Sequence, residues 1–237
     1  MVYAPDGKTL WLVDGRNILH KVNADTLLEE VTLDMGADCN EMAYSQAGLV
    51  LVLNNAQVLW VVEPDTLRVI REMPFSGIRL AAGCPATPLG FVAGSGSTGS
   101  RSATFELAAV DFARGLVLQR TNVHTGIWQA SGRSGTAGTQ NMENILSMKM
   151  SPSGDFLYLS CESIKRLQIG DDKLRYVEST QHLSNGHMRH LALSSDGKWT
   201  ATPAEAGSGT SYGIAVFDAL YLKEQKLVLD NGPYPSL

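Results

Sequence analysis

Gly94-Ser95-Gly96-Ser97-Thr98-Gly99 is the segment that most resembles a cofactor-binding motif, because it matches G-x-G-x-x-G directly after an apolar run. In dinucleotide-binding proteins such a loop opens a helix whose N-terminus faces the pyrophosphate. Residues 102–114 could form that helix, but Val110-Asp111 belongs to a series of strand-like repeats, and residues 116–119 contain no acidic side chain. We therefore interpret the motif as a Gly/Ser-rich loop and expect no bound cofactor.

Two histidines stand close together in Gly186-His187-Met188-Arg189-His190. Residues three apart on a β-strand point to opposite faces, so His187 and His190 cannot easily bind one metal ion. The other histidines are scattered, at His20, His124 and His182. The sequence contains no G-x-S-x-G motif and no cysteine in a recognisable nucleophile motif. It thus predicts neither a metal site nor an identifiable set of catalytic residues.

The three cysteines, Cys39, Cys84 and Cys161, are isolated from one another. An odd number argues against a complete disulfide framework, although one pair with a spare thiol would also fit. We interpret them as buried free thiols, which favours a reducing, cytoplasmic compartment. The first residues lack the basic and apolar regions of a signal peptide, but Met1 need not be the natural start, so the localisation stays open.

The composition is that of an ordinary globular protein of 237 residues, with 44% hydrophobic and 18% charged residues and a net charge of -5. No Lys/Arg cluster is long enough to attract nucleic acid. No apolar run approaches the roughly 20 residues that span a bilayer. We therefore expect neither a nucleic-acid partner nor a membrane partner.

Internal repetition is the clearest structural signal. Residues 22–29 (VNADTLLE) and 62–69 (VEPDTLRV) share Asp, Thr and Leu in the same order, 40 residues apart. Residues 110–116 and 169–174 look like third and fourth copies, and residues 216–220 begin a looser fifth. Each copy is an apolar run, a polar turn and another apolar run, which is typical of paired β-strands.

A second marker, a tight turn with glycine, precedes the copies. It is clear in residues 5–10 (PDGKTL), 151–156 (SPSGDF) and 194–199 (SSDGKW), shorter at 45–49, and degenerate around 88–90. Asp-Gly and Ser-Gly favour such turns because glycine reaches positive φ without a Cβ clash. Each unit of about 40 residues therefore contains four strands joined by turns, which is the pattern of a propeller blade.

The predicted strands are short and rich in β-branched and aromatic residues, as in residues 49–53 (LVLVL) and 58–62 (VLWVV). Three of the four tryptophans, Trp11, Trp60 and Trp199, stand in strands, where we expect them to pack in the core. With its Ser-Gly and Asp-Gly turns and its Asp-Thr-Leu stretches, the sequence resembles tandem-repeat β-propellers of the WD-repeat and Tyr-Val-Thr-Asn (YVTN) types. The Trp-Asp and Gly-His dipeptides of WD repeats are absent, so the second type is the closer likeness.

The resemblance implies an all-β fold, a β-propeller of about five four-stranded antiparallel blades. We expect a single propeller domain or propeller segment over residues 1–237. The ring could be incomplete, as part of a larger propeller with further blades or domains in a longer chain, or it could close as five blades. The approximate blades are residues 1–37, 38–76, 77–124, 144–185 and 186–230, with an insertion at 125–143.

Three Gly/Ser-rich stretches lengthen the repeats, at residues 94–103, 125–143 and 203–213. In an up-and-down blade, the loop after the second strand and the loop leaving the fourth strand lie at the same end. All three stretches are therefore predicted on one face, where repeat proteins often bind partners. Trp128 stands inside the longest stretch and is a candidate contact anchor, although it could instead fold back over the blade edges.

The first strand of each blade is expected to line the central channel, here at residues 40–44, 78–81, 145–150 and 188–191. Their leading ends would bring polar side chains to the channel mouth: Asp38, Asn40, Glu41, Arg79, Glu143, Asn144, His187 and Arg189. Such a rim could hold a protein or a small polar ligand, or its charges could simply pair with each other. The sequence favours a non-catalytic binding module using this mouth. The alternative is a propeller enzyme, a lactonase-like hydrolase or a redox enzyme, with its site at the same place.

Overall fold

The computed structural model describes residues 1–53, 55–96, 104–122, 145–160, 163–170, 174–179, 190–206 and 211–230. The chain divides into two compact units, Met1–Met142 (unit 1) and Glu143–Leu237 (unit 2). In the described ranges, no helix is long and apolar enough to cross a membrane.

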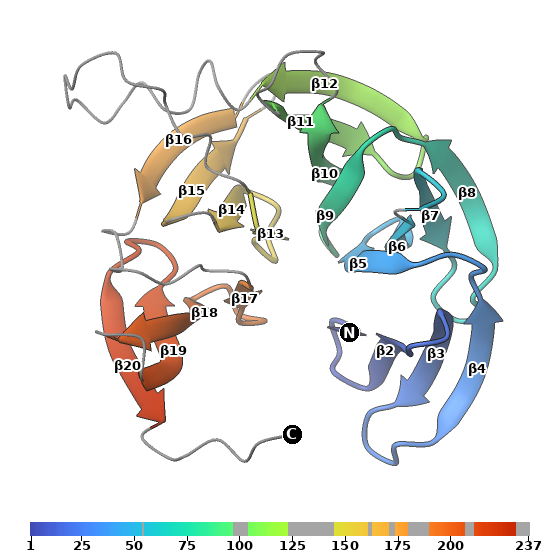
Figure 1. The fold of residues 1–237 in the computed structure, drawn as a ribbon, viewed down its shortest axis with the longest axis horizontal. Helices are drawn as coiled ribbons and strands as arrows, with labels where there is room; N and C mark the ends of the chain where they lie inside the picture. The colour runs from blue at the N-terminus through green and yellow to red at the C-terminus, as the bar shows by residue number, and fades with distance from the viewer. Residues whose placement is uncertain are drawn as a thin grey trace. The chain divides into compact units, whose positions relative to one another are not determined.

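Unit 1 contains three four-stranded antiparallel sheets within its described residues, each in the order of the chain. Sheet 1 consists of β1 (Val2–Tyr3), β2 (Thr9–Val13), β3 (Ile18–Asn23) and β4 (Glu29–Asp34). Sheet 2 consists of β5 (Cys39–Ser45), β6 (Gly48–Leu53), β7 (Val58–Val62) and β8 (Val69–Pro74). Sheet 3 consists of β9 (Ile78–Cys84), β10 (Thr87–Gly96), β11 (Thr104–Asp111) and β12 (Leu116–Asn122). In Figure 1 the fourth strands β4, β8 and β12 lie along the outer side of unit 1.

Unit 2 contains two sheets of the same kind in the residues that are described. Sheet 4 consists of β13 (Ser147–Met150), β14 (Phe156–Ser160), β15 (Ile164–Ile169) and β16 (Leu174–Ser179). Sheet 5 consists of β17 (Ala192–Leu193), β18 (Trp199–Ala206), β19 (Ser211–Asp218) and β20 (Glu224–Asp230). The predicted fold class, an all-β propeller with five four-stranded antiparallel blades, is confirmed.

The glycine turns join the first and second strands of their sheets, as predicted. Gly7 donates its N–H to Ala4 O, and Gly154 donates to Ser151 O, both at 2.9 Å. Both glycines have positive φ, 72° and 84°. A residue with a β-carbon is strained at positive φ. Glycine is therefore favoured at this position, and it marks the turn in the sequence.

The turns between third and fourth strands also repeat. Asn23, Asp111 and Asp218 each accept backbone N–H groups of the following turn, for example Tyr221 N at 2.8 Å from Asp218 Oδ1. A residue with positive φ completes the turn, and this is Leu27 in sheet 1 and Leu67 in sheet 2. The sequence repeat therefore reflects a polar side chain that caps its own turn.

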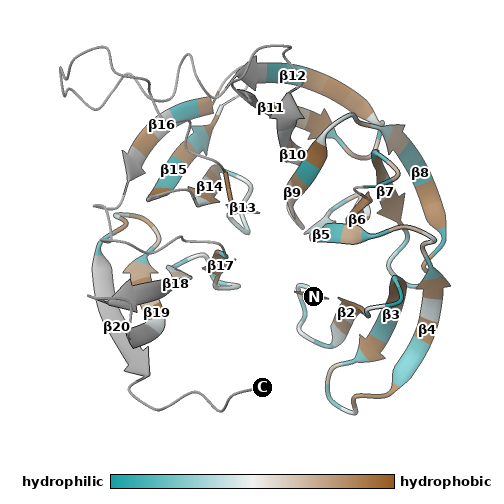
Figure 2. Ribbon diagram, in the orientation of Figure 1, coloured by the Kyte–Doolittle hydropathy of each residue, from teal (hydrophilic) through white to brown (hydrophobic). Residues whose placement is uncertain are grey.

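The core of unit 1 lies between its sheets. One cluster joins sheets 1 and 2 through residues such as Trp11 and Leu51, and another joins sheets 2 and 3 through Leu59 and Val110. Figure 2 shows hydrophobic residues along β6 and β7, in the middle of sheet 2, and hydrophilic stretches on the outer strands β4 and β8.

The tryptophans do not all pack in the core. Trp11 is 2% exposed and stacks on Tyr44, whereas Trp60 is half-buried and donates its indole N–H to Glu72. For Trp199 the expectation of core packing is wrong, since this side chain is 44% exposed. Alternation along β18 explains the difference, because Thr200 is fully buried and its neighbour Trp199 points to the opposite face.

The predicted first strands agree with β5, β9 and β13, but β17 begins only at Ala192, after the expected residues His190 and Leu191. Side-chain hydroxyls hold this segment instead of a backbone ladder. Thr202 Oγ1 donates to His190 O at 2.9 Å, and Leu191 N donates to Ser147 Oγ at 3.3 Å. The hydroxyls satisfy backbone groups that would otherwise need a strand partner.

Two of the three Gly/Ser-rich stretches partly continue the strands. The β10–β11 ladder extends to the pair Gly96 and Thr104, and the β18–β19 ladder extends to Ala206 and Ser211. The described part of the G-x-G-x-x-G motif is therefore strand, and β11 occupies the place of the helix that a dinucleotide site would require. The stretch at residues 125–143 lies outside the described residues.

In each of the five sheets, the ladder between the third and fourth strands contains a β-bulge with one unpaired residue on the fourth strand. The register skips this residue, and it is Glu30, Ile70, Leu118, Val177 or Gln225 in sheets 1 to 5. Three of these bulge residues are exposed aliphatic side chains: Ile70 at 45%, Leu118 at 53% and Val177 at 39%.

Candidate functional site

The structure describes three of the seven predicted binding residues, and all three lie in unit 1. Asn40 and Glu41 are in β5, and Arg79 is in β9. The other predicted residues, Trp128, Asn144, His187 and Arg189, lie outside the described residues, as does Glu143, and their roles stay predictions.

Asn40 and Arg79 are both the extra residue of a β-bulge. On β5, Cys39 pairs with Leu53 and Glu41 with Val52, so the ladder skips Asn40. On β9, Ile78 pairs with Gly94 and Leu80 pairs with Ala93, so the ladder skips Arg79. Both residues are exposed. Bulges of this kind turn a side chain away from the regular alternation of a strand, and they are common beside binding and catalytic sites.

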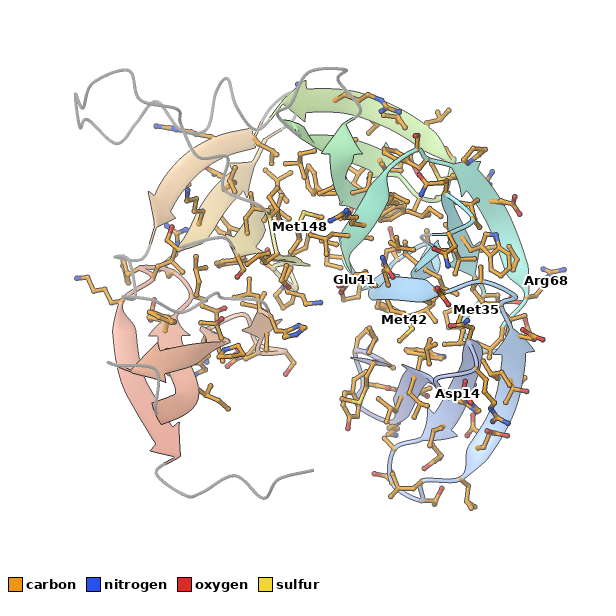
Figure 3. The ribbon with its side chains drawn as sticks, viewed as in Figure 1. Asp14, Met35, Glu41, Met42, Arg68 and Met148 are labelled. Atoms are coloured by element: carbon orange, nitrogen blue, oxygen red, sulfur yellow. The ribbon has the colours of Figure 1, made fainter. Side chains whose placement is uncertain are left out.

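The two bulges occur at the same end of neighbouring strands. β5 and β9 are the first strands of sheets 2 and 3, which share a core cluster, and Gln46 N, just after β5, donates to Cys84 O at the end of β9 (3.1 Å). Both strands run from their bulge towards this contact, so both bulges lie at the opposite end of the strands. We call the group Asp38, Asn40, Glu41 and Arg79 the inner-strand site. Figure 3 shows Glu41 on β5 and Arg68 at the outer edge of unit 1.

Asp38 holds the segment before β5 by contacts to two sheets. Its Oδ1 accepts from Asn17 Nδ2 at 2.8 Å and its Oδ2 accepts from Asn55 Nδ2 at 2.5 Å. Asn17 belongs to the β2–β3 turn and Asn55 to the β6–β7 turn. One carboxylate therefore ties a turn of sheet 1 to a turn of sheet 2 and fixes the chain two residues before the Asn40 bulge.

The Arg79 bulge has an equivalent anchor. Gln57 in the β6–β7 turn accepts the backbone N–H of Phe75 at 2.8 Å on its carbonyl and that of Gly77 on its side chain. Gly77 also lies against β10, where a β-carbon at Gly94 would stand 2.2 Å from Gly77 O. The Arg79 bulge is therefore held by the turn of the preceding sheet, as the Asn40 bulge is.

Sequence reasoning missed these anchoring residues. Asn17 and Gln57 are 40 residues apart, the repeat length, and both have positive φ, 65° and 53°. Each accepts the backbone N–H of the residue that follows its fourth strand, Met35 or Phe75. Both residues carry an amide side chain in the turn that follows a second strand. Aligning the repeats 40 residues apart would have revealed this shared feature.

Asp14, in the β2–β3 turn of sheet 1, forms an ion pair with Arg16 in the same turn. The N–H of Ile18 first, and then the N–H and guanidinium of Arg16, hold the pKa of Asp14 well below its ordinary value. The Arg16 guanidinium lies 2.9 Å from the carboxylate. Arg79, by contrast, has no ion-pair partner within the described part of the chain, so its charge is available to an incoming group.

The lowered pKa of Asp14 predicts an acid-dependent loss of stability. A carboxyl group whose pKa is lower in the folded than in the unfolded chain stabilises the fold at pH values above the unfolded pKa, which is 3.8 here. This stabilisation is progressively lost as the pH falls from 3.8 towards the folded pKa. Asp14→Asn should therefore be less stable than the wild type at about pH 6, and the difference should shrink by about pH 2.5. Urea unfolding at both pH values measures this. Asp25→Asn, in the β3–β4 turn, is the control, and an equal pH dependence for the two variants would contradict the assignment.

The prediction of buried thiols holds for Cys84, whereas Cys39 is only half-buried, and neither of the two forms a disulfide. Burial raises the pKa of Cys39 to about 11, so the thiol is protonated and unreactive near neutral pH. Among the described residues, no group of three or more His, Cys, Asp or Glu side chains is placed to hold a metal ion.

Solved structures match the fold, whereas no protein-family model and no curated protein matches the sequence. The Neurospora crassa Pan2 WD40 domain aligns with a TM-score of 0.63 and 9% identity, over 95% of this chain and 64% of that chain. KlAtg21, solved in complex with the coiled-coil of AgAtg16, gives 0.61 and 14%, over 90% and 64%. A chain of Kuenenia stuttgartiensis hydrazine synthase gives 0.59 and 16%, over 81% and 49%.

The present chain thus spans between 49% and 64% of the length of these three neighbours. At such low identities the likeness shows the fold alone, a β-propeller with WD40 propellers among its structural neighbours.

Proposed function

We propose that the chain is a non-catalytic interaction module that binds a segment of a partner protein across the inner-strand site. The observation that carries this proposal is the pair of bulges at Asn40 and Arg79, one on each of two neighbouring first strands. Both turn an exposed polar side chain out of the sheet at the same end of unit 1.

Preorganisation supports the proposal. The chain before each bulge is already fixed, by Asp38 in one case and by Gln57 in the other. A partner that binds there would not need to order these segments, so less of its interaction free energy would be lost on association. The structural neighbour KlAtg21 was solved in complex with the coiled-coil of AgAtg16, which supports a protein partner for a chain of similar fold. We also propose that the repeats are of the Tyr-Val-Thr-Asn type. The Asp-Thr-Leu turns, which are capped by a polar side chain, support this assignment.

A steric block tests the proposed function. Peptides that bind the purified protein are selected from a random display library, and the affinity of the tightest one is measured by calorimetry. Asn40→Tyr adds a bulky ring beside the bulge and should weaken binding by roughly tenfold or more. Gln46→Tyr, an exposed position at the other end of β5, is the matched control.

Equal binding by the two tyrosine variants and the wild type would show that peptides bind elsewhere. A library that yields no binding peptide at all would also contradict the proposal. Circular dichroism of both variants checks that the sheets are intact.

A further inference from the structure

The turn between β11 and β12 differs at one position from the equivalent turns of sheets 2 and 5. Leu67 and Leu222 each donate their backbone N–H to the carbonyl of the residue four positions earlier, and Gly115 donates to Asp111 O in the same way. All three donors have positive φ. Leu67 is buried in the cluster between sheets 1 and 2, whereas glycine offers no side chain at the corresponding place between sheets 2 and 3.

Arg71, on β8 of sheet 2, lies across this glycine. A β-carbon built on Gly115 would stand 2.7 Å from Cδ and 3.6 Å from Nε of Arg71. A second contact joins the same part of the two sheets, because the guanidinium carbon of Arg120 lies 4.8 Å from the centre of the Phe75 ring. The stem of Arg71 therefore rests on the turn of sheet 3, and the exposed side chain lies beside the outer strands β8 and β12 of Figure 1.

The charge of Arg71 is not compensated within the described part of the chain, where no hydrogen bond or ion pair involves its guanidinium. The nearest turn does contain a carboxylate, that of Asp111, but this group is already engaged. Its Oδ1 accepts the N–H of Arg114 at 2.9 Å, and its Oδ2 lies 3.6 Å from Arg114 Nε. The Arg71 guanidinium is therefore available to a group from another molecule.

Exposed aliphatic side chains adjoin both partners of the contact. Ile70 directly precedes Arg71 and is 45% exposed, and Leu116 directly follows Gly115 and is 51% exposed. Val117, the next residue on β12, is 38% exposed. We call Ile70, Arg71, Gly115, Leu116 and Val117 the outer-strand site. An arginine next to exposed apolar side chains is a composition typical of protein interfaces.

From this arrangement we propose that the outer-strand site binds a segment of a partner protein in which an acidic residue is flanked by aliphatic residues. The proposal goes beyond the inner-strand site, because it gives the chain a second attachment point, on the fourth strands of sheets 2 and 3. The partner's carboxylate accepts two parallel N–H···O bonds from Arg71, and its aliphatic side chains pack on Ile70 and Leu116. Packing there excludes water, which strengthens the charged pair.

Two features favour a protein segment over other anionic partners. Membrane surfaces and nucleic acids are bound through several cationic side chains at once, whereas this site offers one arginine without a partner in a chain of net charge -5. The contact with Gly115 also positions the stem of Arg71 in advance, so less conformational freedom is lost when a single carboxylate binds.

A peptide selection that avoids the inner-strand site tests this inference. Peptides are selected from a random display library on the Asn40→Tyr variant, and the tightest one is synthesised with acetylated and amidated ends and measured by calorimetry. Arg71→Glu in the same background should weaken its binding by about 10- to 100-fold, the range for one charged hydrogen-bonded pair. The peptide with lysine in place of its acidic residue should bind the Arg71→Glu protein more tightly than it binds the parent.

A second variant changes the site without changing any charge. Leucine occupies the equivalent position at Leu67 and Leu222, so Gly115→Leu should fold, but its β-carbon would displace the Arg71 stem. It should weaken peptide binding by roughly tenfold or more. Arg71→Lys keeps the charge without the planar fork and should retain part of the affinity.

The control is Lys8→Glu, which makes the same change of charge at an exposed position in the β1–β2 turn of sheet 1 and should leave binding unchanged. Circular dichroism checks that the sheets of each variant are intact. An equal loss for Lys8→Glu and Arg71→Glu would show that general attraction, and not this site, binds the peptide.

Three further results would overturn the inference. They are equal binding by Arg71→Glu and its parent, selected peptides without an acidic residue, and a selection that yields no peptide. A wild-type dimer in sedimentation velocity that Arg71→Glu dissociates would assign the site to a second copy of this chain instead. The proposed function is judged separately, on peptides selected with the wild type, and it fails if Asn40→Tyr leaves their binding intact.

Discussion

Replacing Gly90 by alanine is expected to lower the free energy of unfolding of unit 1 by about 3 kcal/mol. Gly90 lies in β10, where a β-carbon would stand 2.1 Å from Cε2 of the Phe112 ring and 2.5 Å from Ala82 O. Phe112 is fully buried in the cluster between sheets 2 and 3, and the carbonyl belongs to the neighbouring strand, so neither atom can move away easily. Thermal unfolding followed by circular dichroism measures the loss.

Gly15→Ala is the matched control for Gly90→Ala. Nothing lies within 4 Å of a β-carbon built at Gly15, so the same substitution there should change the free energy of unfolding by less than about 0.5 kcal/mol. Trimming the ring in the double variant Gly90→Ala/Phe112→Leu should recover part of the loss. Equal stabilities for Gly90→Ala and Gly15→Ala would show that the contact at Gly90 does not restrict the sheet.

Leu67→Gly is expected to be the second large effect, with a loss of about 2–4 kcal/mol. Leu67 has positive φ, 54°, which an aliphatic residue adopts at a cost of about 1 kcal/mol. It is nevertheless only 2% exposed and belongs to the core cluster between sheets 1 and 2. Glycine would relieve the backbone but remove the buried side chain, and the lost burial is the larger effect. Urea unfolding measures the balance.

Leu27, at the equivalent place in sheet 1, isolates the backbone contribution. It has the same conformation, with φ of 57°, but it is 73% exposed. Leu27→Gly should therefore change the free energy of unfolding by less than about 1 kcal/mol, because relief of strain and the greater freedom of the unfolded chain nearly cancel. A loss as large as that of Leu67→Gly would mean that the turn conformation, and not burial, requires leucine.

The repeating strands and turns could be predicted because their causes are local. A Ser-Gly or Asp-Gly turn and a polar side chain that caps its own turn are each complete within about six residues. The five third strands accordingly end inside the five copies of the repeat, from Asn23 in residues 22–29 to Asp218 in residues 216–220. The exposure of Trp199 could not be predicted in this way, since it depends on which face of β18 meets the neighbouring sheet.

The candidate site could be located from the sequence only in outline. Topology alone placed Asn40, Glu41 and Arg79 near the leading ends of first strands, and the structure agrees. That Asn40 and Arg79 are bulge residues depends on register with β6 and β10, which single-strand patterns do not contain. The anchors Asn17 and Asn55 come from turns of different sheets, and both donate to Asp38.

The extra residue in each fourth strand has a consequence for solubility. A fourth strand is the free edge of its sheet, and a regular edge offers a row of backbone N–H and C=O groups on which another chain can add a strand. Ile70 and Leu118 interrupt that row near the start of β8 and β12, which disfavours a continuous ladder between two molecules that meet edge to edge. The bulges thus allow aliphatic side chains to be exposed along the rim while protecting the protein from edge-to-edge aggregation.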